Sequence, residues 1–132
     1  MPHVSIEYSS NIDRVVDVGA FCSAIRDACL ETGVFPFAGI RVRATRVDHF
    51  VIADGDPDHM FMDISVRLRG GRDLETRKSA TTHIFTAAKE FLAPVIESEP
   101  IALSFEMRDI DPDLSPKLNT VRDRLQEAEA SS

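Results

Sequence analysis

Proline at position 2 is the first residue whose type and position could carry chemistry. A proline after Met1 permits removal of Met1, and the free terminus is then a secondary amine. Val4 and Ile6 alternate with polar residues, so Pro2 would begin a half-buried strand and be held on a rigid element. If burial and nearby cations lower its pKa from about 8 to about 6.5, the amine is mostly neutral at pH 7 and can act as a general base. Most chains that begin with Met-Pro use the proline only for Met1 removal, so the position alone leaves both interpretations open.

Arginines supply the other candidate groups. Arg41 and Arg43 alternate with apolar residues on a second predicted strand, where they could form a cationic face or serve only as solubility residues. Arg72 follows Gly70-Gly71 and precedes Asp73, a predicted helix N-cap. Backbone N–H groups at a helix start together with a guanidinium favour carboxylate or phosphate binding, although the glycines could merely shape a turn.

The composition limits the classes of function. The chain has 132 residues, 15 Lys+Arg and 22 Asp+Glu, which gives a net charge of −7 and predicts one globular domain over residues 1–132. This acidic balance argues against nucleic-acid binding, and the lack of a long apolar run or signal-peptide pattern predicts a cytoplasmic protein without membrane spans. However, 8 of the 15 basic residues lie between Arg41 and Lys78, so a cationic site on an anionic protein is possible.

No metal site or other catalytic constellation is predicted. The four histidines are scattered and no cysteine pair has zinc spacing; they are His3, His49, His59 and His83, with Cys22 and Cys29 on the apolar stripe of a helix. The acidic run 54–58 resembles the start of a calcium loop, but Pro57 interrupts it and no glutamate follows at the twelfth position. The acids of 106–113 lack the spacing of a paired-carboxylate site and are interpreted as a solvated edge.

The elements that must position these groups follow from hydrophobic periodicity and turn residues. The predicted order is strand 2–8, helix from Asp17 to Gly33, strand 38–52, turn 54–58, strand 60–68, helix from Asp73 closed by Pro94 and Pro100, strand 101–110, and an arm over about 112–132 with one helical piece whose apolar anchors are Leu118, Val121 and Leu125.

Strand, helix and strand therefore occur twice. Two right-handed βαβ units predict an α+β fold with one four-stranded mixed sheet and two helices on one face. The chain is too short to cover the other face, so we expect another copy of the chain to cover it, with the arm as a clasp.

Five segments resemble 5-carboxymethyl-2-hydroxymuconate isomerases of the tautomerase superfamily. They are Met-Pro-His at the start, TGVFPFAGIRVR over 32–43, ADG over 53–55, GRDLETR over 71–77 and ALSFE over 102–106, and the similarity extends from Pro2 to about Arg122.

The resemblance implies a tautomerase-like homotrimer in which Pro2 transfers the proton. The family's substrate-binding arginines correspond to Arg41 and Arg72, with Arg43 as a third. Such isomerases act in homoprotocatechuate and 4-hydroxyphenylacetate catabolism, need no cofactor, and convert a polycarboxylate dienol into its conjugated oxo isomer. Two alternatives stay open: a tautomerase-fold enzyme for another unsaturated oxo-acid, and a non-catalytic trimeric binding module in which retained Met1 blocks Pro2.

Overall fold

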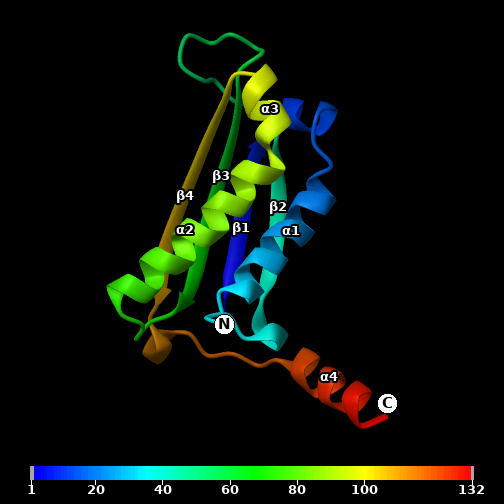
Figure 1. The fold of residues 1–132 in the computed structure, drawn as a ribbon, viewed down its shortest axis with the longest axis vertical. Helices are drawn as coiled ribbons and strands as arrows, with labels where there is room; N and C mark the ends of the chain where they lie inside the picture. Colours follow the sequence, from blue (N-terminus) through cyan, green and yellow to red (C-terminus); the bar gives the residue numbers. More distant parts are fainter. Residues whose placement is uncertain (1, 132) are drawn as a thin grey trace.

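The computed structural model describes residues 2–131, with side chains described for residues 2–126; Met1 and Ser132 lie outside this range. Figure 1 shows the order of the elements: β1 (His3–Ser9), η1 (Ser10–Arg14), α1 (Val18–Glu31), η2 (Phe37–Gly39), β2 (Arg41–Val47), β3 (Met60–Arg69), α2 (Leu74–Phe91), α3 (Ala93–Ser98), β4 (Ile101–Ile110), η3 (Pro112–Leu114) and α4 (Thr120–Ser131).

The sheet confirms the predicted duplication. Its four strands lie in the order β2-β1-β3-β4. Strands β1 and β2 are parallel, as are β3 and β4, and the two pairs join through the antiparallel contact of β1 with β3. The fold is therefore two βαβ units that share one mixed sheet.

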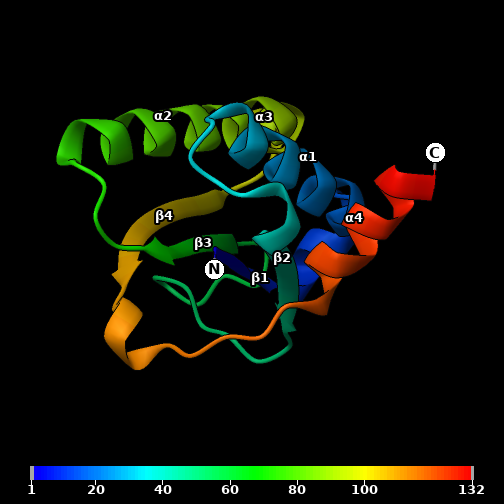
Figure 2. The same ribbon diagram turned by 90° about the horizontal axis from the view of Figure 1, so that it is seen from below.

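The helices α1 and α2 cover one face of this sheet, as predicted (Figure 2). Alternation along β1 and β3 buries every second side chain under them, including Val4 and Ile64, which are 0% exposed. Phe21 of α1 and Phe91 of α2 meet edge to face with ring centroids 5.3 Å apart. Because the alternate residues turn to the opposite face, that face carries mostly polar side chains from β1 and β3, together with Phe61.

Both predicted helix starts are correct. The Asp17 carboxylate accepts a hydrogen bond from the Ala20 N–H at 3.0 Å, and the Asp73 carboxylate accepts one from the Thr76 N–H at 2.8 Å. After α1, Gly33 adopts a φ of +74°, which favours glycine and ends the helix.

The second strand is shorter than the predicted 38–52. Residues 37–39 form a 3-10 turn, and β2 ends at Val47. Val47 pairs with Ser9, the last residue of β1. In the described part of the chain, β1 is the only strand that pairs with β2. Beyond Val47 the edge strand has no partner, so residues 48–59 form a connection instead.

Two local predictions need correction. Pro94 does not close the second helix but lies in the first turn of α3, where a missing N–H costs no hydrogen bond. Of the three predicted anchors of the arm, Leu118 and Val121 are 90% and 57% exposed, and only Leu125 is partly buried. Asn119 ties the arm instead, because its side-chain amide donates to the Ala38 carbonyl at 2.9 Å.

Over the described part of the chain, no helix is both long and apolar enough to cross a membrane. The same residues contain no group of three or more His, Cys, Asp or Glu side chains that could hold a metal ion.

Candidate functional site

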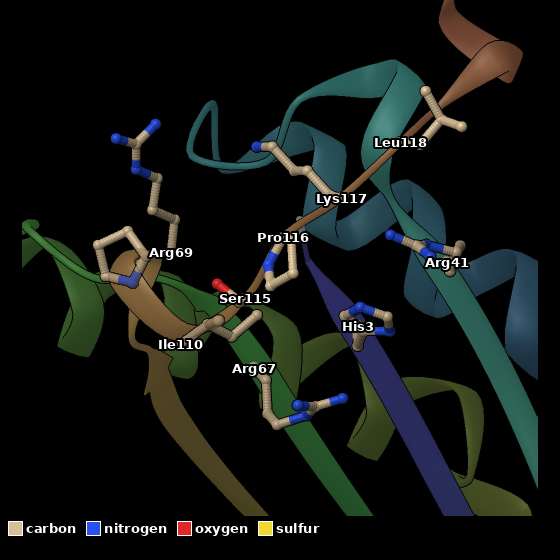
Figure 3. A pocket seen from close by; sticks show the side chains of 10 residues that line it. His3, Arg41, Arg67, Arg69, Ile110, Ser115, Pro116, Lys117 and Leu118 are labelled. Atoms are coloured by element: carbon tan, nitrogen blue, oxygen red, sulfur yellow. The ribbon is translucent and has the colours of Figure 1, made fainter.

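A cavity of about 510 Å³ opens where β1 and β2 begin and β3 and β4 end. The arm after β4 forms its other wall, so residues far apart in the sequence meet there (Figure 3). Its lining consists of His3, Arg41, Arg67, Arg69, Ile110, Pro112, Ser115, Pro116, Lys117 and Leu118.

Arg41, His3 and Arg67 form a row across three strands. His3 of β1 pairs in register with Arg41 of β2 on one side and with Arg67 of β3 on the other. All three lie on the face opposite the helices, and Figure 3 shows their side chains next to one another. The row concentrates two guanidinium groups around one imidazole.

Arg43 extends this cationic group two residues further along β2, where it pairs in register with Ser5. Its Nη1 lies 3.2 Å from Nδ1 of His3. Because a guanidinium can only donate, Nδ1 of His3 accepts and the ring proton resides on Nε2.

The pKa of His3 reflects its burial and the positive charges of the row. Burial, followed by the charges of Arg41, Arg67 and Arg43, lowers the pKa of His3 from 6.5 to about 4. The imidazole is therefore neutral near pH 7.

Pro2 is buried directly before His3. Its carbonyl accepts a hydrogen bond from the Arg41 N–H at 3.3 Å, which fixes the start of β1 against β2. A Cβ added at Gly39 would lie 3.3 Å from Cδ of Pro2, so glycine provides the room for the pyrrolidine ring. Pro2 thus lies against η2 and beside His3, but it is not among the residues that line the cavity.

Arg72 does not line the cavity. Its Nη1 donates to the Arg69 carbonyl at 3.0 Å and its Nη2 to the Val34 carbonyl at 2.7 Å. These contacts join the turn before α2 to the loop after α1. Of the predicted arginines, the structure brings Arg41 and Arg43 together at His3 and holds Arg72 at the neighbouring turn.

Three cationic residues of the cavity were not predicted from the sequence: Arg67, Arg69 and Lys117. The alternation that buries Met60 to Leu68 also predicts that Arg67 and Arg69 face away from the core, so a signal for the arginines existed. Lys117 had none, because the arm before α4 has no periodicity that could place a side chain.

The family model described as "CHMI: 5-carboxymethyl-2-hydroxymuconate isomerase" matches residues 2–125. A 5-carboxymethyl-2-hydroxymuconate Delta-isomerase of Escherichia coli is 36% identical over 121 residues, which cover 92% of this chain and 96% of that protein.

Two solved structures show the same arrangement of elements. The crystal structure of a 5-carboxymethyl-2-hydroxymuconate delta-isomerase superposes with a TM-score of 0.89 at 31% identity, and the match covers 96% of this chain and 93% of the other. A "fused 4-OT wild type symmetric trimer" superposes with a TM-score of 0.63 at 16% identity, covering 89% of this chain and 94% of the other. The second likeness concerns the fold alone.

Proposed function

The chain belongs to the 5-carboxymethyl-2-hydroxymuconate isomerase family of the tautomerase superfamily, and we propose that Pro2 is the proton-transfer group of its reaction. The activity is the isomerisation of 5-carboxymethyl-2-hydroxymuconate in homoprotocatechuate catabolism.

In the proposed reaction the neutral Pro2 nitrogen accepts the proton of the dienol hydroxyl. The O–H bond breaks and a C=O bond forms, while the electrons of the diene shift toward a distant carbon. The prolinium then returns the proton to that carbon, which forms the new C–H bond. The product is a conjugated ketone of the same composition, so the enzyme ends each turnover in its starting state.

The observation that carries this proposal is the environment of Pro2, next to the pair formed by His3 and Arg41. Pro2 is buried next to His3, whose pKa is held at about 4 by burial and by the surrounding guanidinium groups. The same causes favour a neutral amine at Pro2. This requires that Met1 be removed, because an acylated Pro2 is a non-basic amide; Met1 lies outside the described residues.

The arginines are proposed to bind carboxylates of the substrate and to stabilise the dienolate charge. Arg41 lines the cavity directly. Arg43 lies behind it, hydrogen-bonded to Nδ1 of His3, and adds positive charge to the same region. A guanidinium has five N–H donors, and Arg72 uses two of them on backbone carbonyls, which leaves three for a carboxylate. Its backbone contacts would hold the guanidinium in place before substrate binds.

We also propose a homotrimer. The sheet face opposite the helices carries polar side chains, and the arm carries exposed Leu114, Leu118 and Val121. A partner copy would remove these apolar side chains from water. The symmetric trimer with a similar fold supports this assembly.

The test is the ultraviolet decay of 5-carboxymethyl-2-hydroxymuconate on adding protein whose intact mass shows that Met1 is absent. We expect a large acceleration over buffer, and a loss of about 10²-fold or more in kcat for Pro2→Ala with little change in KM. Pro57→Ala, in the connection between β2 and β3, is the matched control and should keep wild-type kcat.

Other outcomes point elsewhere. Near wild-type kcat in Pro2→Ala would refute the base assignment. Processed protein without activity on this substrate but with activity on another unsaturated oxo-acid would change the substrate class. Retention of Met1 in the native host, together with inactivity, would favour a trimeric binding module.

A further inference from the structure

Among residues 2–126, the cations that line the cavity have no acidic partner. Within residues 2–126, salt bridges engage Arg26, Arg46, Arg77, Lys78 and Arg108, but none involves the four cavity cations Arg41, Arg67, Arg69 and Lys117. The chain has 22 acids for 15 basic residues, so partners are in excess. Like charges that lie close together without counterions repel one another, and a bound anion relieves this repulsion.

Arg67 lies across His3 from Arg41. Each is the direct register partner of His3, on β3 and β2 respectively. Two strand spacings place their Cα atoms about 10 Å apart. Their long side chains can therefore approach one extended anion from its two sides.

Lys117 approaches from a different element. It lies on the arm between η3 and α4, and Figure 3 shows the arm passing in front of the strand ends. Asn119 holds the arm to the Ala38 carbonyl, and the Ser115 hydroxyl donates to the Asp111 carbonyl at 2.6 Å. Lys117 is thus placed over the cavity rather than on the sheet.

We propose that Arg67 and Lys117 each bind a carboxylate group of the substrate, so that the cavity between the strand ends and the arm is a tricarboxylate site. The inference rests on the proposed function for the identity of the substrate. Muconate carries two carboxylates, and the carboxymethyl group of the family's substrate adds a third. The residues nominated from the sequence are Arg41, Arg72 and Arg43, of which only Arg41 lines this cavity. Arg67 and Lys117 provide the additional charge that a third carboxylate requires.

Binding of an unreactive ligand tests the site separately from catalysis. Calorimetry would compare propane-1,2,3-tricarboxylate with pentanedioate, which lacks the middle carboxylate. We expect the wild type to prefer the tricarboxylate about tenfold or more, the equivalent of one charge-assisted contact. Arg67→Gln and Lys117→Gln should each remove most of that preference. Arg26→Gln on α1 and Lys78→Gln on α2 change the net charge equally and should preserve it.

If both Arg67→Gln and Lys117→Gln kept the wild-type preference for the tricarboxylate over pentanedioate, the proposal would be overturned. The same variants in the isomerase assay should raise KM about tenfold with kcat nearly unchanged, because binding to an unreacting carboxylate is uniform between ground state and transition state. Arg67→Lys keeps the charge and should recover part of the affinity. If the wild type binds the tricarboxylate selectively but does not isomerise the dienol, the proposed function fails and this site stands. If the wild type is active and both variants keep the wild-type KM, the proposed function stands and this site fails.

Discussion

The lowered pKa of His3 makes the stability of this protein depend on pH in a defined window. In the unfolded chain His3 titrates near 6.5, and in the folded chain burial and the charges of Arg41, Arg67 and Arg43 lower its pKa to about 4. Between these values the unfolded state binds more protons than the folded state. The free energy of unfolding therefore falls as pH decreases from 6.5 to 4, and the contribution is fully present above pH 6.5.

The size of the effect follows from the shift. A difference from 6.5 to about 4 corresponds to at most about 3.5 kcal/mol, since one pKa unit is about 1.4 kcal/mol. The imidazole is only partly buried, so solvent screening reduces this value, and we expect about 1–2 kcal/mol between pH 7 and pH 4.5.

Urea unfolding of wild type and His3→Gln at both pH values and one protein concentration measures this term. Glutamine cannot titrate but can still accept a hydrogen bond from Arg43. We expect the pH-dependent loss to be smaller in His3→Gln by about 1–2 kcal/mol. His83→Gln, which removes an exposed imidazole paired with Glu31 on the helix layer, is the control for losing a histidine elsewhere. An equal pH dependence in wild type and His3→Gln would refute the cationic field on which the neutrality of Pro2 also depends.

Three further predictions concern the site. In Gly39→Ala the new methyl would press on Cδ of Pro2, which is bonded to the reacting nitrogen, so kcat should fall about tenfold. Gly19→Ala on α1 is the control and should leave kcat unchanged. Equal kcat values for the two variants in steady-state assays would contradict the packing argument. Asn119→Ala releases the arm from η2 and should raise KM several-fold with kcat preserved, whereas an unchanged KM would show that the tether does not serve binding. Arg41→Lys keeps the charge but replaces a bidentate donor, so kcat/KM should drop about tenfold, and full activity would refute a forked carboxylate contact.

Much of the fold could be predicted because the chain repeats its pattern. Alternation over His3–Ser9 and Met60–Arg69 defines two strands with one apolar face, and Asp17 and Asp73 mark the helix starts. These signals are local, so they can be recognised in the sequence without knowing which elements pack against them. The 3-10 turn η1 carries no such period, and its buried Asn11 is held by the His59 carbonyl at 2.8 Å, a contact 48 positions away in the chain.

The sequence alone determined the residue types at the site: a proline next to the terminus, a concentration of arginines after residue 40, and the faces on which they lie. Only the tertiary structure decided which of these charges meet. The register of β1 with β2 and β3 places Arg41 and Arg67 on either side of His3, and the path of the arm adds Lys117. Register and arm path depend on pairing between distant segments, and a local periodicity specifies the face of a strand but not its neighbours.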